Sequence, residues 1–323
     1  MDNTEIDDAG AEREPLRVVF MGTPAFAIPA LEAILDAGYN VPLVVSTPDA
    51  VKGRGLQSIP SALKSYALEE GLEVYTPASL REEETAERIR AAAADVIVVV
   101  AFRILPQSIY TIPRLGSFNL HASLLPRYRG AAPINWAIIN GESETGVTSF
   151  FLKKQVDTGA IILQRAVPIG PDMSAGELHD VLMRLGAEVV VETLRRIERG
   201  EAVPLEQDDA AATPAPKIFR DDCRIDWGLP GESVRNFIRG LSPRPGAWTT
   251  LRGKVFKILR ARFTGDAGEG LAPGEIVTRE GGIIVGVDGG MLELLEVQQE
   301  GKRPMGGGEF SRGFAFVEGE YFE

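Results

Sequence analysis

Cysteine and histidine are scarce in this chain, which has one cysteine and two histidines among 323 residues. The single cysteine, Cys223, cannot form an intramolecular disulfide. The few cysteines and histidines also do not offer the ligand spacing of a structural zinc site. The sequence therefore indicates neither a disulfide scaffold nor a metal centre.

Long apolar runs are also lacking. No stretch approaches the roughly 18 apolar residues of a membrane-spanning helix. The first residues are acidic and polar, without the apolar region of a secretory signal. A hydrophobic content of 44% with 25% charged residues is ordinary for a folded globular protein. We expect a cytoplasmic protein with no membrane partner, in which residues 1–15 form a flexible N-terminus.

Apolar strand-like runs alternate with helical patterns through the first half of the chain. Such runs occupy residues 16–20 and 41–46 and begin again at Asp95. Helical spacing occupies 26–38, 61–71 and 83–94. This alternation is typical of a parallel sheet covered by helices on both faces. It predicts an α/β domain with an open, mostly parallel, Rossmann-like sheet over 16–200. The first turn, GTPAF, lacks the later glycines of G-x-G-x-x-G, so dinucleotide binding is not expected.

The second half changes character. Ser174 and Glu177 form a capping-box pattern that predicts the start of a long helix ending near Gly200. Linker composition follows, which we place at 201–219. Short strands separated by glycine turns then predict a smaller β-barrel-like domain, similar to an OB fold, over 220–323.

Charge is distributed unevenly along the chain. The net charge is −12, which argues against a nucleic-acid partner at first sight. However, residues 217–262 contain eleven basic and four acidic residues. Such a segment is commonly only a solvated surface. It is also the composition that a phosphate backbone would require.

One strand-like run ends in an unusual pair of polar residues. Asn119 and His121 are two positions apart, so they project from the same face of the expected strand. An amide can hold a developing oxyanion, and an imidazole can donate to it or move a proton. Asp157, in the D-T-G of QVDTGAIIL, is the best candidate for a carboxylate partner. Both residues also have an interpretation without chemistry. His121 can be a buried packing histidine, and Asp157 can form an Asx-turn. His179, in the long helix, is interpreted as a surface or packing residue.

The stretch SFNLHASLLPRYRGAAPINW, followed by GESETGVTSFFLKKQVDTGAIIL, resembles the catalytic core of the 10-formyltetrahydrofolate-dependent formyltransferases. The resemblance extends from FMGTPAFAIPALEAIL near the start to the RIDW stretch of the last domain. It implies the formyltransferase fold and formyl transfer from 10-formyltetrahydrofolate to an amine. It also implies that Asn119, His121 and Asp157 are catalytic, with no metal and no covalent intermediate.

The same resemblance implies a folate site. The strand end AFRILP resembles the segment that binds the pterin ring, and the SLLP segment resembles the wall of the cleft. The residues concerned are Phe102, Arg103, Ile104, Leu105, Ser123, Leu124, Leu125 and Pro126.

Within the family, the chain is most similar to the members that formylate initiator methionyl-tRNA without a protein partner. In those members a loop corresponding to 47–60 meets the acceptor stem, and the linker and last domain follow the RNA backbone. The residues that this similarity makes candidates are Lys52, Arg54, Lys217, Arg252, Lys254 and Lys257. The loop has fewer lysines than is typical, and Gln155 replaces a glycine that many relatives have before D-T-G.

Three alternatives remain open. A formyltransferase acting on an amino-sugar nucleotide would share the SLLP and RGxAP regions. A purine-pathway enzyme would need only about 200 residues and no last domain. A catalytically silent tRNA-binding protein would have no reason to keep Asn119, His121 and Asp157 together. The small, β-rich second domain, with its basic segment 217–262, favours tRNA as the substrate.

Overall fold

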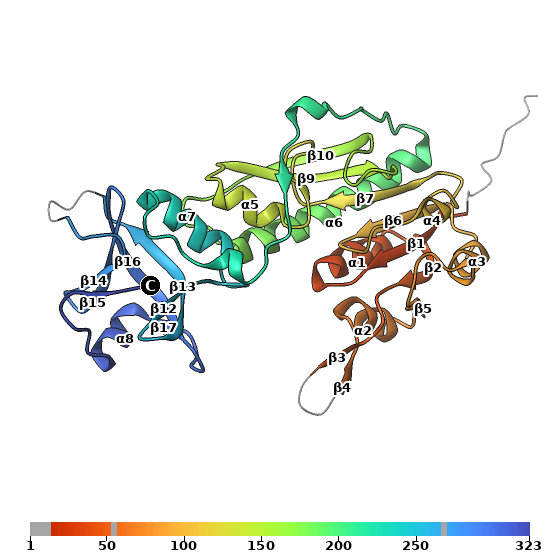
Figure 1. The fold of residues 1–323 in the computed structure, drawn as a ribbon. Helices are drawn as coiled ribbons and strands as arrows, with labels where there is room; N and C mark the ends of the chain where they lie inside the picture. Colours follow the sequence, from red (N-terminus) through yellow and green to blue (C-terminus); the bar gives the residue numbers. More distant parts are fainter. Residues whose placement is uncertain (1–13, 53–56, 266–269) are drawn as a thin grey trace, which may run out of the picture. The chain divides into compact units, whose positions relative to one another are not determined.

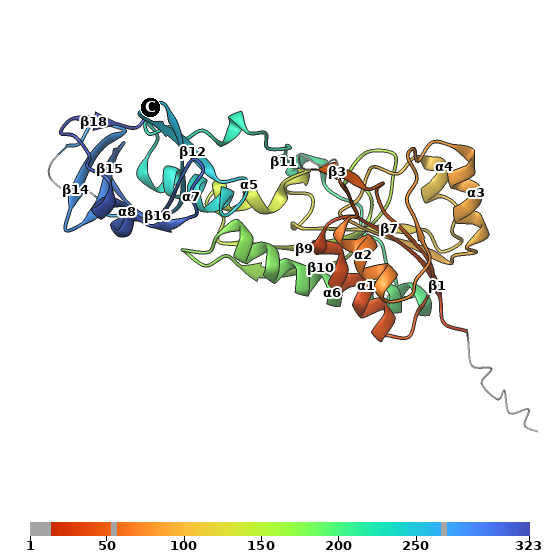
Figure 2. The same cartoon turned by 90° about the horizontal axis from the view of Figure 1, so that it is seen from below.

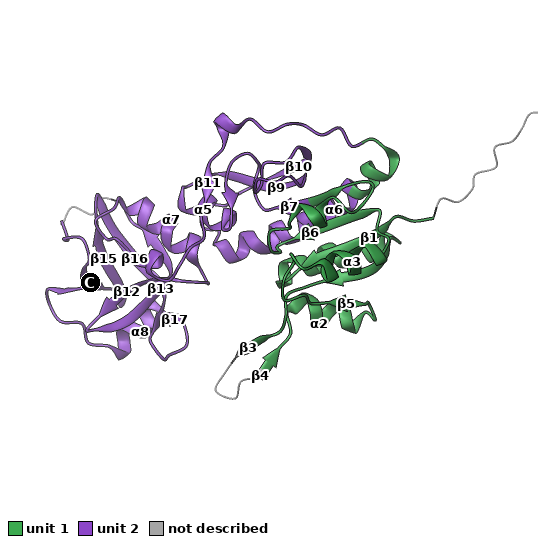
Figure 3. Cartoon of the chain, turned by 45° about the vertical axis from the view of Figure 1, so that its right-hand side comes forward, with its two compact units in different colours: residues 1–118, 194–201 green, residues 119–193, 202–323 purple. Residues whose placement is uncertain are grey.

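The chain is described by a computed structural model that covers residues 14–52, 57–265 and 270–323. Nearly all of the N-terminus expected to be flexible, residues 1–15, lies outside these ranges. The chain divides into two units, one formed by residues 1–118 with 194–201 and the other by 119–193 with 202–323 (Figure 3). The domain bounds expected from sequence pattern, 16–200, 201–219 and 220–323, stay a prediction. In the described ranges, no helix is both long and apolar enough to cross a membrane.

The first unit contains the parallel part of the predicted sheet (Figure 1). Its strands lie in the order β6-β1-β2-β5, and each neighbouring pair is parallel. All five residues of β6 are buried, as are the last five of β1. These strands are apolar throughout because both faces of the sheet are covered. Their bounds are β1 (Arg17–Gly22), β2 (Asn40–Val45), β5 (Val74–Tyr75) and β6 (Val96–Val100).

The strand order determines the face of the sheet on which each helix of this unit lies. The connections from β1 to β2 and from β2 to β5 step in one direction, whereas the connection from β5 returns across the sheet to β6. Right-handed crossovers therefore place α1 and α2 on one face and α3 on the other (Figure 2). The direction changes between β1 and β6, which is where open α/β sheets bind ligands. The short helices are η1 (Ala25–Ala27), α1 (Ile28–Asp36), α2 (Ala62–Glu69), α3 (Glu83–Ala91) and α4 (Gln107–Tyr110).

The segment 47–60, predicted as a loop, contains a short antiparallel pair. Strand β3 (Ala50–Lys52) pairs with β4 (Gln57–Ile59). Three-residue strands are too short to show a hydrophobic period, so the prediction of an irregular loop was wrong here. Arg54 and the side chain of Lys52 lie outside the described part of the chain.

The second unit begins within β7 (Ser117–His121), which continues the sheet order from β6 to β9 and β10. Strands β9 (Glu144–Phe151) and β10 (Ile161–Pro168) are antiparallel. Helix α5 (Pro133–Ile139) precedes them, and α6 (Ala175–Arg199) follows. The predicted capping box is confirmed. The amide of Ser174 donates to Glu177 Oε2 at 2.7 Å, and the amide of Glu177 donates to Ser174 Oγ at 3.2 Å.

The predicted linker is in contact with other parts of the second unit. Strand β11 (Pro214–Ala215) pairs in parallel with β8 (Arg129–Gly130). Leu205 exchanges two backbone hydrogen bonds with Ile161, of 2.7 and 2.8 Å. The segment also contains η2 (Asp209–Ala211), and η3 (Asp221–Cys223) follows it. The composition of residues 201–219 indicates only that this segment has too few apolar residues to form a core of its own. Its backbone can still pair with other strands.

The C-terminal part is a curled antiparallel sheet in the order β12-β13-β16-β15-β14-β18, with β17 paired to β16. At its end, Glu323 exchanges backbone hydrogen bonds of 3.1 and 3.3 Å with Thr250 of β12, so the curl returns to its first strand. The expected small β-barrel-like domain is confirmed. Its elements are α7 (Gly231–Leu241), β12 (Ala247–Leu251), β13 (Lys254–Phe263), β14 (Glu275–Arg279), β15 (Gly282–Val287), β16 (Gly290–Gln299), β17 (Met305–Gly306), α8 (Gly307–Gly313) and β18 (Glu320–Tyr321).

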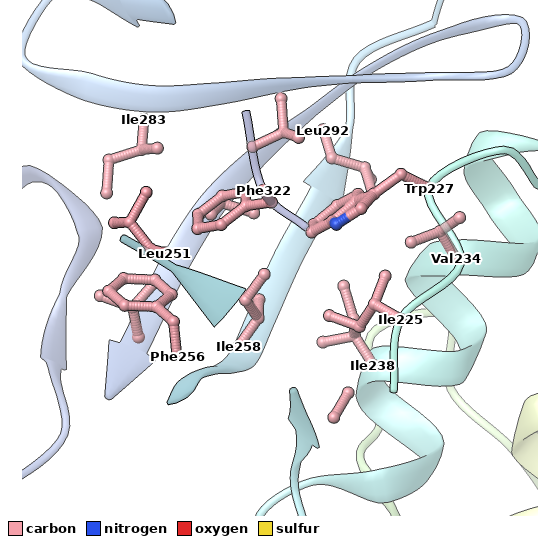
Figure 4. Close-up of a cluster of buried hydrophobic side chains, with 14 of the residues drawn as sticks. Ile225, Trp227, Val234, Ile238, Leu251, Phe256, Ile258, Ile283, Leu292 and Phe322 are labelled. Carbon is pink, nitrogen blue, oxygen red and sulfur yellow. The ribbon is translucent and has the colours of Figure 1, made fainter. Parts of the chain in front are cut away.

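An aromatic core fills this curled sheet (Figure 4). Trp227 stacks on Phe322 with ring centroids 5.4 Å apart, and Phe322 also contacts Phe256 at 5.3 Å. Ile238 of α7 and Ile258 of β13 are fully buried in the same cluster. The RIDW stretch noted in the sequence thus supplies core residues to the last domain.

Candidate active site

His121 is the last residue of β7 and is only 6% exposed. Asn119, two positions earlier, is half-buried, and the strand alternation puts both side chains on one face. The Nε2 of His121 lies 2.8 Å from the carbonyl oxygen of Tyr128. Its Nδ1 lies 3.8 Å from Oδ2 of Asp157, which is 9% exposed. Two residues from distant segments are therefore brought together beside Asn119.

These contacts give the two ring nitrogens of His121 different surroundings. A carbonyl oxygen only accepts hydrogen bonds, so Nε2 is the donor in the contact with Tyr128. Nδ1 lies 3.8 Å from the Asp157 carboxylate, which is beyond hydrogen-bond distance. Because Nε2 is engaged by Tyr128, Nδ1 is the nitrogen that remains for a reacting group.

Asp157 has an unusual backbone. Its φ of 56° lies in the left-handed region, which non-glycine residues enter rarely. Its Oδ2 accepts the amide N–H of Gly130 at 2.9 Å. The observed carboxylate bond therefore reaches a residue 27 positions earlier, instead of closing an Asx-turn within D-T-G.

The two glycines beside Asp157 are required sterically. A Cβ at Gly159 would lie 1.5 Å from the carbonyl oxygen of Phe151. Gly130 has a φ of 131°, and a Cβ there would lie 2.5 Å from the carbonyl oxygen of Ala215. Only glycine allows these close backbone approaches, which bring the turn, the Arg129–Gly130 segment and the linker together.

The carbonyl that engages His121 is itself held firmly. Tyr128 is buried, and its amide donates to Thr213 Oγ1 at 2.8 Å. Its hydroxyl donates to Glu142 at 2.6 Å. Burial and this hydrogen bond raise the pKa of the Tyr128 hydroxyl, so it remains a donor. Hydrogen bonds at the amide and at the hydroxyl of Tyr128 thus hold in place the carbonyl that contacts His121.

The predicted wall segment follows the strand directly. The carbonyl of Ser123 accepts from Thr148 Oγ1 at 2.6 Å, and the amide of Leu125 donates to the same hydroxyl at 3.1 Å. Gln164 donates to the carbonyl of Leu125 at 2.8 Å. Leu124 and Pro126, which complete the predicted set, are half-buried. These hydrogen bonds hold the segment in one conformation next to the end of β7.

The predicted pterin segment, Phe102–Leu105, directly follows β6 in the first unit. Arg103 donates to the carbonyls of Pro77 and Ala78 at 2.9 and 3.1 Å, and its guanidinium lies over the Phe102 ring. Burial lowers the pKa of Arg103. Leu105 is buried, whereas Ile104 is 73% exposed. The segment therefore follows β6 beside the reversal of strand order and carries one exposed apolar side chain; its role in folate binding stays a prediction.

The basic residues expected to bind RNA occupy two places in the second unit. Lys217 stacks over the exposed ring of Phe219 at 5.2 Å. The other three lie on the β12–β13 hairpin. There, Lys254 is exposed, Lys257 donates to the carbonyl of Pro245 at 2.7 Å, and Arg252 pairs with Glu320 at 2.6 Å. The ion pair neutralises part of the charge that Arg252 would offer to a phosphate.

Within the described ranges, no group of three histidine, cysteine, aspartate or glutamate side chains could hold a metal ion. The expectation of a reaction without metal stays a prediction.

Sequence reasoning missed three contributors to this site: Tyr128, Thr148 and Gln207. Tyr128 acts through its backbone carbonyl, which any residue type would supply. Thr148 lies in a strand where a buried threonine is unremarkable. Gln207 lies in the linker-like segment, where nothing local indicates a partner. None of the three carries a signal in the sequence alone.

Comparison with known proteins identifies the class to which this fold and site belong. Residues 16–194 match the formyl transferase family, and residues 217–315 match the formyl transferase C-terminal domain. The chain belongs to the formyl transferase family.

Particular relatives are close. The methionyl-tRNA formyltransferase of Chlorobium phaeovibrioides is 48% identical over 313 residues, which cover 95% of this chain and 98% of that protein. The methionyl-tRNA formyltransferase of Bacteroides fragilis is 45% identical over 317 residues, covering 95% of this chain and 98% of the relative.

Solved structures share the fold. An N-formyltransferase from Helicobacter canadensis, in complex with folinic acid and dTDP-3-aminofucose, has a TM-score of 0.66 at 21% identity and covers 88% of this chain and 99% of its own. Methionyl-tRNA formyltransferase from Clostridium thermocellum has a TM-score of 0.54 at 16% identity and covers 88% of this chain and 98% of its own.

Proposed function

We propose that this protein transfers the formyl group of 10-formyltetrahydrofolate to the amino group of initiator methionyl-tRNA. The observation that carries the proposal is the buried His121–Asp157 pair beside Asn119, in a chain 45–48% identical over 95% of its length to methionyl-tRNA formyltransferases. The pair supports acyl transfer as the reaction type. The similarity to these relatives supports methionyl-tRNA as the substrate.

The geometry supports a role for each side chain. The amine would attack the formyl carbon, and negative charge would develop on the formyl oxygen. The tetrahedral adduct would then collapse with cleavage of the bond between the formyl carbon and N10 of the folate, which would take up the proton lost by the amine and leave as tetrahydrofolate. The Asn119 amide and the Nδ1–H of His121 would donate to that oxygen, a contribution of roughly 10² to 10³ in rate for one such donor. Asp157 would keep His121 cationic and take part in moving the proton from the attacking amine.

The folate assignment is supported by the position of Phe102–Leu105. This segment follows β6 at the point where the strand order reverses. A Cβ at Gly22, the end of the adjacent β1, would lie 2.9 Å from the carbonyl oxygen of Val100. A side chain at position 22 would therefore be crowded beside this strand end. The Ser123–Pro126 segment would form the wall beside the formyl group.

The amino-sugar alternative is less well supported. The Helicobacter canadensis N-formyltransferase, solved in complex with dTDP-3-aminofucose, is similar at 21% identity, which supports the fold alone. The tRNA-directed relatives match 95% of the chain, and the C-terminal family match covers the basic segment 217–262. The cytoplasmic location and the absence of a protein partner stay predictions.

The proposed function is tested by following tetrahydrofolate release in the ultraviolet from 10-formyltetrahydrofolate. Release is expected with initiator methionyl-tRNA and not with uncharged tRNA, because only the charged form has the acceptor amine. A dTDP-linked amino sugar serves as the competing substrate. Release with the amino sugar alone would replace our assignment with that alternative, and no release with either would reject both.

RNA binding by the basic residues makes a separate prediction. Replacing Lys217 and Lys254 by alanine should weaken tRNA binding uniformly across sequences. If each lysine neutralises one phosphate, the slope of log K against log salt should fall in magnitude by about 1.5. The measurement is a filter-binding titration at several salt concentrations. Arg165→Ala, whose side chain pairs with Glu188 on α6, is the matched control. An unchanged slope in the double variant would place the RNA elsewhere.

A further inference from the structure

We propose that Gln207 is a positioning residue that holds Asp157 against His121; the inference rests on the proposed formyl transfer. The Nε2 of Gln207 donates to the carbonyl oxygens of Asp157 at 2.9 Å and Gly159 at 2.8 Å. One side chain therefore secures both ends of the D-T-G turn.

The same amide also contacts Arg129, the residue before the one that binds the Asp157 carboxylate. Its Oε1 accepts from Nε and from one terminal nitrogen of Arg129 at 3.0 and 2.8 Å. Arg129 precedes Gly130, whose amide donates to Oδ2 of Asp157. Gln207 thus joins the segment that carries the acid to the segment that binds the acid's carboxylate.

The groups around position 207 need both a hydrogen-bond donor and an acceptor, which a side-chain amide provides. Two carbonyl oxygens need a donor, and the Arg129 guanidinium needs an acceptor. Among neutral side chains of this length, only glutamine supplies two N–H donors and a carbonyl acceptor together. Glutamate, with nearly the same shape, would keep the acceptor but place a charge against two carbonyls.

The residues around Gln207 hold its side chain at the D-T-G turn. Gln207 is half-buried, whereas every other residue from 203 to 210 is exposed. Leu205 pairs with Ile161 on one side, and Asp209 forms an ion pair with Arg129 at 2.7 Å on the other. The chain is fixed two residues before and two residues after Gln207. A left-handed Asp157 needs such support, because its backbone conformation is intrinsically unfavourable.

Two variants separate the two halves of the contact. Gln207→Glu keeps acceptors for Arg129 and removes the donor to the turn, whereas Gln207→Ala removes both. We expect turnover to fall roughly tenfold to a hundredfold in each, because a small displacement of a catalytic group costs rate rather than binding. The KM values for folate and tRNA should change less than threefold.

The second readout does not depend on activity. The chain has only two histidines, so proton NMR of the imidazole rings gives two sets of histidine signals, which His179→Ala assigns. A displaced carboxylate changes the charge that faces Nδ1 of His121, so at a fixed pH the chemical shifts of the His121 ring protons should differ from those of the original protein. The His179 signal should not move.

The matched control is Glu206→Gln, one residue away. Glu206 is exposed and pairs with Lys153. It should retain both the turnover and the His121 ring signals of the original protein. Equal loss in this control would assign the effect to the linker in general and overturn the proposal. So would an unshifted His121 signal in both Gln207 variants.

The two proposals fail in different ways. If the unmodified protein transfers no formyl group while the His121 signal still moves in the Gln207 variants, the positioning role stands and the proposed function falls. If the unmodified protein transfers the formyl group, and neither turnover nor the His121 signal changes in the Gln207 variants, the proposed function stands and the positioning role falls.

Discussion

Replacing His121 by alanine is expected to lower turnover at least a hundredfold, the usual scale for loss of a general acid or base. The substitution removes the imidazole that faces Asp157 at 3.8 Å and leaves the basic residues of the last domain in place. Affinity for tRNA should therefore be nearly unchanged. The measurement combines steady-state formyl transfer with an equilibrium binding titration of the same preparation.

The chain provides its own control for this substitution. His179, the only other histidine, lies in α6 and interacts with Asp180 at 3.0 Å. His179→Ala should keep full turnover. Undiminished turnover in His121→Ala would remove this residue from the mechanism, and equal losses in both variants would point to general destabilisation.

Replacing Gly159 by alanine is expected to have the second large effect. Its Cβ would meet the carbonyl oxygen of Phe151 at 1.5 Å, so the D-T-G turn must move. Overpacking of this kind costs about 1–3 kcal/mol or more of unfolding free energy. The carboxylate of Asp157 moves with the turn, and a displacement near 1 Å can lower turnover about a hundredfold.

Gly170→Ala is the matched control for the glycine prediction. There the nearest atoms to a new Cβ are 3.7 and 3.9 Å away, which is ordinary contact. Urea denaturation should show a lower unfolding free energy for Gly159→Ala only, with turnover reduced in the same variant. A Gly159→Ala protein with normal stability and turnover would show that the turn can accommodate a side chain, contrary to the steric argument.

Local patterns were enough to predict most of the fold. The strands β1, β2 and β6 are apolar on both faces, and the helices between them carry a clear period. Such signals arise within ten residues, so they can be detected without knowledge of the tertiary structure. The capping box at Ser174 is equally local. In contrast, the three-residue strands β3 and β4 show no period and were missed.

Half of the candidate site could also be predicted. The two-residue period of a strand places Asn119 and His121 on one face, and the position after a sheet strand points to a ligand crevice. Asp157 was a candidate because of its residue type and its turn. Its contact with Gly130 and its left-handed backbone appear only in the structure.

The sequence alone determined where the regular elements lie, which residues can carry acyl-transfer chemistry, and that a basic segment follows an acidic domain. Only the tertiary structure decided that Tyr128 engages Nε2 of His121, that β8 pairs with β11, and that Gln207 joins Asp157 to Arg129. The reason is that periodicity and capping are properties of neighbouring residues. Hydrogen bonds between distant segments, such as the one between Tyr128 and Thr213, 85 positions apart, depend on how the whole chain folds and cannot be detected in a short pattern.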